Sequence, residues 1–495
     1  MNINAYRYRP PKTNYLPHNV DVDNPMVEEY EIPLRKADEG ENEAFFNKMK
    51  LAAQEYNIVR PKGYTVSYHA TDEMEKHHFG QTHPMKPWRL TLTKSLVTSY
   101  GMPFAMDNYN TRHATYEELS AFHSTDYLDY LATAAPEDQP RESDNEKEPK
   151  FNLGGSDCPL FHGLYDYCSM SAGTSLDAAR KICNKQSDIA IAWGGGLHHA
   201  KKSEASGFCY INDIVLAILQ LLRVYPRVLY IDIDVHHGDG VEEAFYSTDR
   251  VMTVSFHKYQ PDTFFPGTGS LEDNGPQSEH NPGAHHAINV PLNDGITDEQ
   301  YKNLFENIIG AVNEKFRPSA IALQCGADSL AGDRLGRFNL KVQGHGNCVR
   351  FCKSLGLPMI MFGGGGYTPR NVARAWAHET SIAIGADSNI PSTIPEHAPW
   401  RDHFIHDTLF PTLTQSLHEP RSNRNSEKRL REIVNHVHEQ LRFVQHAPSV
   451  QSTIIPPDLG GIRDEVEERL KEENEANNEG LRKTREEGVG SAMEF

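Results

Sequence analysis

Five short apolar runs alternate along the chain with longer stretches of helical periodicity, and this alternation constrains the fold more than any other feature. The apolar runs are Asp188–Trp193, Val228–Val235, Val251–His257, Ala320–Cys325 and Pro358–Phe362. The helical stretches are Tyr165–Ile182, Asp213–Tyr225, Asp298–Lys315 and Val342–Leu355. Strands that are apolar nearly throughout must be covered on both faces. We therefore predict an α/β fold, a single large domain with a central, mostly parallel sheet and helices on both faces.

The segments outside this alternation are polar. Residues 1–60 are rich in Pro, Asn and charge, so we expect an irregular N-terminal extension with one short helix near Glu43–Tyr56. The stretch Pro136–Lys150 is typical of a long surface loop. Residues 456–495 are highly charged and predict a flexible tail. The main domain is then expected to span residues 61–455.

Composition and charge argue against several classes of protein. The chain has 495 residues and a formal net charge of −19, which disfavours a broad DNA-binding face because duplex affinity comes largely from Lys and Arg. We therefore expect no direct sequence-specific binding of nucleic acid. We also expect no membrane insertion, since no stretch approaches the roughly 20 apolar residues of a spanning helix. The N-terminus lacks the apolar segment of a secretory signal. Seven cysteines without CxxC pairs fit a reducing compartment.

In a parallel sheet of this kind, ligands bind beyond the carboxyl ends of the strands, so the residues after each run are candidates for chemistry. Gly194–Gly196 follow the first run and lead into His198 and His199. Gly363–Gly366 follow the last run and lead into Tyr367. The second glycine loop lacks the Gly-Lys-Ser/Thr ending of a P-loop, which disfavours nucleotide binding.

A metal site is predicted where two of the runs end. Asp232, Asp234 and His236 share one face of the second run, because strand side chains alternate with period two. Two carboxylates and an imidazole on one buried face repel and desolvate one another unless a cation lies between them. Asp328 follows the fourth run. Asp, His and Asp ligands would leave a four-coordinate zinc with one open position, which is the catalytic arrangement.

The side chains near this predicted metal favour amide hydrolysis. A zinc-bound water needs a base, and a neutral His is suited to that role near neutral pH. Attack on an amide carbonyl creates an oxyanion, which zinc and a tyrosine hydroxyl can stabilise together. A lone His pair is often structural, but the position of His198 and His199 directly after a strand favours a functional role.

Several motifs occur along the chain in a characteristic order. They are His83–Pro87, Gly196–Lys202, Glu204–Tyr210, Asp234–Gly240, Phe265–Gly269, Gln324–Ser329, Gly363–Tyr367 and His446–Val450. Together they resemble the class I zinc-dependent histone deacetylases, in particular the eukaryotic enzymes of corepressor complexes. The resemblance runs from about Tyr64 to Gln451. It implies that residues 61–455 form a deacetylase domain that hydrolyses acetyl-lysine to lysine and acetate.

The resemblance also implies a role for each polar residue after the strands. The implied zinc ligands are Asp234, His236 and Asp328. His199 would act as general base and acid, with His198 as its electrostatic partner, although the sequence does not decide which imidazole moves which proton. Asp232 would orient His198, and Asp239 would orient His199. Tyr367 would donate to the carbonyl oxygen and then to the oxyanion.

Further positions match the family's substrate channel and its potassium sites. The channel residues are Gly207, Phe208, Phe265 and Leu335, with Asp157 at the rim and Arg89 at the inner foot. One implied potassium ion lies near Asp232, Asp234, His236, Ser255 and Phe256, and a second near Phe245, Thr248 and Val251. The sequence departs from the family at His286, which stands where an aromatic residue is usual, so His286 is not assigned to the second site.

A set of four basic residues matches the family's site for an inositol polyphosphate. These residues are His78, Lys86, Arg334 and Arg370, and the phosphate is shared with the SANT domain of a corepressor subunit. Converging Arg and Lys side chains suit a polyphosphate. Thr82 and Trp88 depart from the usual Gly and His of this region. The alternative is that the four residues are solvated surface cations.

The resemblance implies acetylated histone tails as substrates and residence in the nucleus, and also in the cytoplasm. Three other functions remain open. The first is a deacetylase for a small molecule such as an acetylpolyamine, on the same fold. The second is a binuclear manganese enzyme similar to arginase, which is disfavoured because Asp234–Asp239 lacks a spaced Asp-x-His-x-Asp run. The third is an inactive scaffold, which is disfavoured because every catalytic position is intact.

Overall fold

The computed structural model describes residues 8–9, 35–36, 39–138, 150–278, 280–417 and 419–444. The chain divides into two units, Met1–His446 and Ala447–Phe495, and all of the described residues belong to the first. Residues 139–149 of the expected surface loop, the expected tail 456–495 and the motif His446–Val450 lie outside the described residues.

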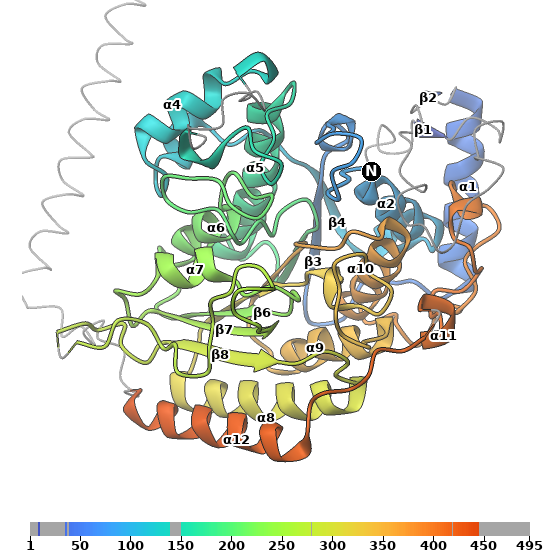
Figure 1. Cartoon of the computed structure of the whole chain (residues 1–495). Coiled ribbons are helices and arrows are strands. Elements are labelled where there is room, and N and C mark those ends of the chain that lie inside the picture. The colour runs from blue at the N-terminus through green and yellow to red at the C-terminus, as the bar shows by residue number, and fades with distance from the viewer. Residues whose placement is uncertain are drawn as a thin grey trace, which may run out of the picture. The chain divides into compact units, whose positions relative to one another are not determined.

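An eight-stranded sheet, in which every pair of neighbouring strands is parallel, forms the centre of the first unit (Figure 1). Its strand order is β4-β3-β5-β10-β9-β6-β7-β8. The strands are β3 (Val66–Ala70), β4 (Asp107–Asn110), β5 (Ile189–Ala192), β6 (Val228–Asp232), β7 (Val251–Lys258), β8 (Ala287–Leu292), β9 (Ala320–Gln324) and β10 (Met359–Phe362). A separate antiparallel pair consists of β1 (Tyr8–Arg9) and β2 (Arg35–Lys36). The predicted α/β fold with a central parallel sheet is confirmed.

Helices connect these strands. They are α1 (Glu39–Glu55), α2 (Arg89–Ser99), α3 (Tyr116–Leu119), α4 (Thr125–Thr133), α5 (Leu164–Cys183), α6 (Asp213–Leu221), α7 (Asp239–Ala244), α8 (Asp298–Phe316), α9 (Val342–Ser354), α10 (Pro369–Ala383), α11 (Leu413–Ser416) and α12 (Glu427–Gln440). The helix expected near Glu43–Tyr56 is α1, and the four predicted helical stretches are α5, α6, α8 and α9. Within the described part of the chain, no helix is both long and apolar enough to cross a membrane.

The central strands are apolar throughout because their two faces pack into different cores. Leu229 and Ile231 of β6 belong to a cluster with side chains of α2, α8, α9 and α10. Val228 and Tyr230 of the same strand belong to a second cluster with side chains of α5 and α6. Full burial of each such side chain contributes about 1.5–3 kcal/mol. The two cores hold the sheet rigid from both sides.

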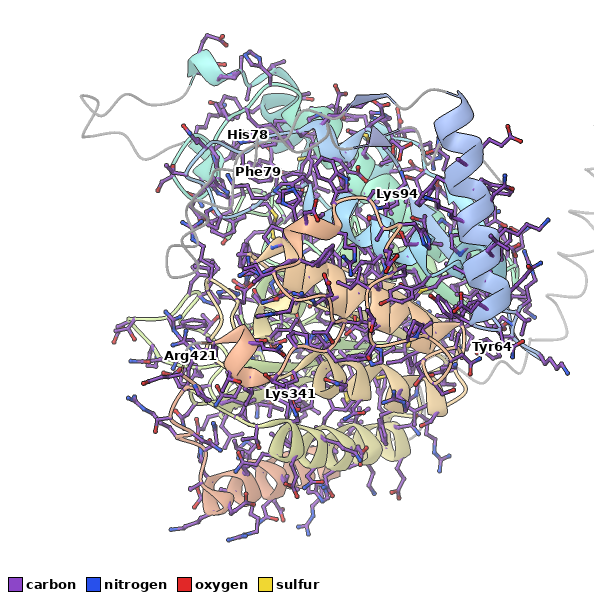
Figure 2. All side chains as sticks on the ribbon, turned by 90° about the vertical axis from the view of Figure 1, so that its right-hand side faces the viewer. Tyr64, His78, Phe79, Lys94, Lys341 and Arg421 are labelled. Carbon is purple, nitrogen blue, oxygen red and sulfur yellow. The ribbon has the colours of Figure 1, made fainter. Side chains whose placement is uncertain are left out.

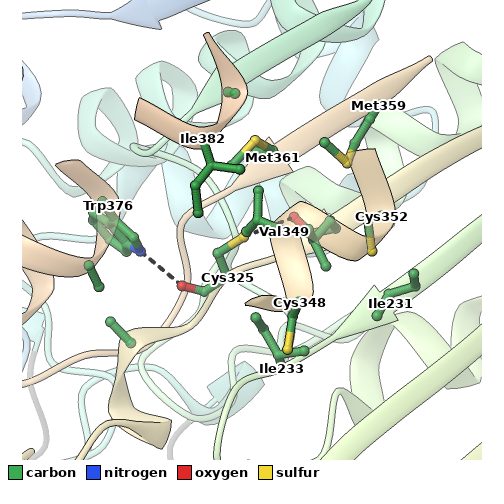
Figure 3. Close-up of a cluster of buried hydrophobic side chains, with 14 of the residues drawn as sticks. Ile231, Ile233, Cys325, Cys348, Val349, Cys352, Met359, Met361, Trp376 and Ile382 are labelled. Atoms are coloured by element: carbon green, nitrogen blue, oxygen red, sulfur yellow. Dashed lines mark hydrogen bonds between the residues drawn. The ribbon is translucent and has the colours of Figure 1, made fainter. Parts of the chain in front are cut away.

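Cys325, which directly follows β9, is a fully buried member of the first cluster. Figure 3 shows it among Ile231, Met361 and Trp376, and the Trp376 indole N–H donates to the Cys325 carbonyl at 2.8 Å. Burial raises the pKa of the Cys325 thiol well above its usual value, so it stays protonated. The cysteine is therefore a packing residue.

Strand β6 is shorter than predicted. We predicted a strand over Val228–Val235, but the strand ends at Asp232. The Ile233 N–H still donates to the Gln324 carbonyl of β9 at 3.1 Å, but the Asp234 N–H leaves the ladder and donates to the Asp232 carboxylate at 3.0 Å. Ile233 and Val235 still pack into the first cluster, so the alternation between polar and apolar residues continues beyond the strand.

Candidate active site

The carboxyl ends of four adjacent strands, β5, β10, β9 and β6, bring their following loops together at one edge of the sheet. The loops after β5 and β10 touch through glycines. A Cβ on Gly196 would lie 2.4 Å from the carbonyl carbon of Gly363, and the φ of Gly196 is +101°, so no other residue fits there without displacement. The glycines that the sequence singled out therefore permit this close approach of two loops.

Three side chains at this edge form a group that can hold a metal ion. They are Asp234, His236 and Asp328, and they are the only such group of His, Cys, Asp and Glu among the described residues. The ligand atoms lie within 4.8 Å of one another, and all three residues are buried. The Nδ1 atom of His236 is 3.0 Å from Asp234 Oδ1 and 3.0 Å from Asp328 Oδ2.

Neighbouring amides orient the two carboxylates of this group. The Gly365 N–H and the Gln324 side-chain amide both donate to Asp234 Oδ2 at 2.8 Å. The Val235 N–H donates to Asp328 Oδ1 at 2.9 Å. These bonds leave the remaining carboxylate oxygens directed at His236. Outer hydrogen bonds of this kind are typical of metal sites, where they fix the ligands in place.

The charges in this group fit a divalent cation. Burial and the charge of Asp234 raise the pKa of Asp328. Burial disfavours the charged form of His236, but Asp234 and Asp328 outweigh it and raise its pKa to about 10. Two carboxylates and one imidazole are the oxygen and nitrogen ligands that zinc binds in catalytic sites. The residues present therefore fit zinc by number, chemistry and arrangement.

Two His–Asp pairs lie next to the metal-binding group. The Nδ1 atom of His198 lies 2.7 Å from Asp232 Oδ2, and the Nδ1 atom of His199 lies 2.7 Å from Asp239 Oδ1. The two imidazole centroids are 3.9 Å apart. Burial lowers the pKa of His198, but Asp232 and Asp234 outweigh burial and raise it to about 9. Burial and the charge of His198 lower the pKa of His199 to about 3.

The two histidines differ in their surroundings. His199 packs edge-on against Phe265 with ring centroids 4.9 Å apart, and a Cβ on Gly207 would lie 2.5 Å from its ring. Its partner Asp239 also binds Lys201, with Nζ 2.7 Å from Oδ2. The Nε2 atom of His198 instead lies 3.8 Å from Oδ2 of Asp234, a member of the metal-binding group. His199 is thus the imidazole that borders the predicted channel.

The residues predicted to line the channel lie around His199 and Tyr367. Phe208 and Tyr367 meet edge to face with centroids 5.6 Å apart, and Phe265 is 42% exposed. Asp157, predicted at the rim, accepts a hydrogen bond at 2.9 Å from the N–H of Gly207, which is predicted to line the channel. Leu335 packs, partly buried, against the cluster that contains Tyr367. Aromatic walls of this kind suit an aliphatic lysine stem.

Arg89 supports the glycine loop from behind. Its guanidinium donates to the carbonyls of Gly366 and Gly364 at 2.7 and 2.6 Å, and it lies over the Trp376 ring at 5.1 Å. Trp376 stacks in parallel on Trp193 with centroids 5.3 Å apart. Burial raises the pKa of Tyr367, which follows this loop, far above its usual value. The phenol is therefore neutral and can donate a hydrogen bond.

The positions implied for potassium lie on β6 and β7 and in the segments next to these strands. Ser255 of β7 pairs with Asp232 of β6, and the Ser255 hydroxyl accepts from the Gly238 N–H at 3.3 Å. Phe256 follows Ser255 on β7. The positions of the second implied ion lie between α7 and the start of β7: Phe245, Thr248 and Val251.

The four basic residues are only partly consistent with solvated cations. Lys86 is 2% exposed, and its Nζ donates to the carbonyls of Gly80 and Gln81 at 3.0 and 2.9 Å. Burial lowers the pKa of Arg370, in the first turn of α10, to about 10. His78 lies beside Phe79 in Figure 2, above Arg421 and Lys341. Arg334 follows Asp333, in the loop after β9.

The structure adds three residues that the sequence did not single out. Phe264 stacks on the His236 ring with centroids 5.1 Å apart and an angle of 4° between the planes. Asp213 accepts from the N–H groups of Gly196 and Leu197, each at 2.8 Å. Asp333 accepts from the N–H of Tyr367 at 2.6 Å. The residue types of Asp213 and Asp333 do not identify their backbone partners, and the sequence does not show that Phe264 packs against His236.

Comparisons with known proteins find relatives over most of the chain. A family model described as the histone deacetylase domain matches residues 83–383, which contain every strand from β4 to β10. The chain is 49% identical to Histone deacetylase HDAC1 of Drosophila melanogaster over 407 residues, which cover 82% of this chain and 74% of that relative. It is 49% identical to Histone deacetylase 1 of Homo sapiens over 393 residues, with coverages of 79% and 78%. It is 47% identical to Histone deacetylase 6 of Arabidopsis thaliana over 427 residues, with coverages of 85% and 87%.

Proposed function

Because the chain belongs to the histone deacetylase family and is a class I histone deacetylase, we propose that it hydrolyses acetyl-lysine amides with a zinc ion held by Asp234, His236 and Asp328. The observation that carries this proposal is the buried Asp-His-Asp group. Zinc bound there supplies a Lewis acid for the amide carbonyl and activates a water molecule. Each remaining task falls to a side chain of the protein.

His199 is the general base and acid of this proposal. Its Nδ1 atom is bonded to Asp239, so Nε2 is the atom that accepts a proton from water and returns it to the leaving amine. Its contact with Phe265, at the channel wall, supports this assignment. His198 is the electrostatic partner, because its Nδ1 atom is hydrogen-bonded to Asp232 and its Nε2 atom lies 3.8 Å from Asp234 Oδ2. Asp232 and Asp239 fix the tautomers of the two imidazoles.

Tyr367 donates a hydrogen bond to the substrate carbonyl and then to the oxyanion. Its neutral phenol, next to the metal-binding group, suits this role because a donor placed where charge develops stabilises the transition state. Gly207, Phe208, Phe265 and Leu335 enclose the lysine stem. Asp157 holds the substrate backbone at the rim, and Arg89 lies at the inner foot of the channel.

We further propose the cofactors and partners that the family implies. Potassium ions bind near Ser255 and near Thr248, and an inositol polyphosphate binds His78, Lys86, Arg334 and Arg370 together with a SANT-domain corepressor subunit. The enzyme then acts on acetylated histone tails in the nucleus, and also resides in the cytoplasm. Residues 61–455 form the catalytic domain, with an extension at 1–60 and a tail at 456–495.

A substrate comparison and a metal analysis test the proposed function. The full chain, purified with its native partners, is assayed on an acetylated histone peptide and on a free acetylpolyamine, and bound metal is measured by mass spectrometry. We expect turnover of the peptide and one zinc ion per chain. Faster turnover of the acetylpolyamine would favour the small-molecule deacetylase, and two manganese ions per chain would favour the binuclear enzyme. His199→Ala is the inactive control.

A further inference from the structure

Asp333 is a buried carboxylate that the proposed mechanism does not use. It lies in the loop after β9 and is 4% exposed. One carboxylate oxygen, Oδ2, accepts from the N–H groups of Tyr367 and Thr368 at 2.6 and 3.0 Å. The other, Oδ1, accepts from the Leu335 N–H at 2.9 Å. A single side chain thus joins the loop that bears Tyr367 to the loop that bears Leu335.

Burial of the Asp333 carboxylate has an energetic cost that needs an explanation. A buried carboxylate is expensive to desolvate unless hydrogen bonds replace its water, and three backbone N–H donors provide that replacement here. An apolar residue would avoid the cost but would leave three N–H groups without an acceptor. The Asp333 carboxylate therefore serves as the acceptor for backbone N–H groups of both loops.

The loop before Tyr367 cannot hold its own conformation through side chains. Gly364 and Gly366 have φ values of +138° and +126°, and Gly363–Gly366 have no side chains to pack. Arg89 fixes the carbonyls of Gly364 and Gly366 from one side. Asp333 fixes the next two N–H groups from the other side. Donor and acceptor contacts together set the backbone from which the Tyr367 phenol projects.

We propose that Asp333 is a positioning residue for deacetylation, which holds Tyr367 against the reacting carbonyl and Leu335 at the channel mouth. The inference rests on the proposed role of Tyr367 as the hydrogen-bond donor. Asp333 does not touch the substrate itself. It acts by keeping the Tyr367 backbone fixed, because an error of about 1 Å in a catalytic group costs on the order of 100-fold in rate.

Single variants give the first test, measured as kcat and KM on an acetylated histone peptide. Asp333→Ala removes all three acceptor bonds, and we expect kcat to fall by about 10- to 100-fold with a smaller change in KM. Asp333→Asn keeps the shape and one acceptor oxygen, so we expect partial rescue. Asp298→Asn is the matched control, because Asp298, the first residue of α8, accepts the backbone N–H of Lys341 at 2.8 Å instead of the N–H groups of Tyr367, Thr368 and Leu335, and its kcat is expected to stay at the wild-type value.

A double-mutant cycle separates positioning from general stability. In a Tyr367→Phe background, we expect Asp333→Ala to lower kcat by less than about twofold, because its partner group is already gone. Zinc content and melting temperature are measured for every variant, and Asp333→Asn carries the cycle if Asp333→Ala does not fold. An equal loss in both backgrounds, or wild-type kcat in both single variants, would overturn the inference. Wild-type activity of Tyr367→Phe would instead refute the proposed mechanism.

Discussion

Two charged clusters of the molecule differ in their balance of positive and negative groups. One surrounds Glu118 on the surface, and the other surrounds Asp234 at the carboxyl ends of the strands. Arg112 binds both carboxylate oxygens of Glu118, at 2.7 and 2.8 Å, and Arg180 contacts both Glu118 and Asp177. Two guanidinium groups thus face two carboxylates. At the sheet edge, two buried carboxylates flank one imidazole. A balanced surface cluster supports the fold by itself, whereas a buried, unbalanced one indicates a bound ligand.

The largest effect is expected for a ligand of the proposed zinc. Asp328→Asn removes one carboxylate from the unbalanced cluster, and we expect kcat to fall by about 1,000-fold with loss of bound zinc. Zinc should raise the melting temperature of the wild type, since it binds only the folded chain, and should not raise that of the variant. An equal thermal shift in both proteins would show that Asp328 is not a ligand.

The second-largest effect on kcat is expected for Tyr367, the proposed hydrogen-bond donor. Tyr367→Phe removes one hydroxyl without altering the packing, so we expect kcat to fall by about 100- to 1,000-fold. Zinc content and melting temperature should stay at the wild-type values. A variant that lost zinc as well would assign Tyr367 to the metal site instead of the oxyanion.

A smaller effect on kcat is expected for Asp239, the carboxylate that is hydrogen-bonded to His199. Asp239→Asn weakens the bond to His199 Nδ1 and the ion pair with Lys201. We expect kcat to fall by about 10- to 100-fold, since outer partners of catalytic imidazoles carry effects of that size. Glu243→Gln is the control, because it removes only the second carboxylate on Lys201. If both variants lost activity equally, the effect would belong to Lys201.

The smallest effect on activity is expected at the balanced surface cluster. Glu118→Gln should leave kcat unchanged but lower the free energy of unfolding by about 1–2 kcal/mol at pH 7. Hydrogen bonds from Arg112 are the main reason that the pKa of Glu118 is lowered from 4.5 to about 2. The carboxylate therefore stabilises the fold above pH 4.5, and this contribution is lost as the pH falls toward about 2.

Chemical denaturation at a series of pH values checks this prediction. The difference between wild type and Glu118→Gln should be constant from pH 7 to about 5 and should shrink at lower pH. A difference that grows as the pH falls would contradict the assigned direction of the pKa shift.

The sequence predicted the central strands and the metal-binding group because both depend on local pattern. Buried central strands are apolar throughout, and residues after parallel strands meet at one edge. Strands β3, β4 and β8 were not predicted. The sequence of β4, Asp107–Asn110, is mostly polar because β4 is an outermost strand with a neighbour on one side only. Strand β8, the other outermost strand, contains Pro291. Their pairing depends on neighbours that are distant in the chain.

The positions of Asp213 and Asp333 could not be predicted for a different reason. Each accepts hydrogen bonds from backbone N–H groups, and every residue except proline carries such a group. No residue type marks the partner, so no pattern in the sequence reveals the bond. By contrast, Asp234 and Asp328 interact with His236, and histidine is a residue type that itself indicates a metal or catalytic site.

The parallel stack of Trp193 and Trp376 has an experimental use. The chain has four tryptophans, and two of them form this stack. A Cβ on Gly363 would lie 2.2 Å from the Trp193 carbonyl and 3.0 Å from the Trp376 ring, so the glycine loop rests directly on the stack. A movement of the loop must change the surroundings of these indoles. Near-ultraviolet circular dichroism and intrinsic fluorescence can therefore follow the loop in solution without an added label.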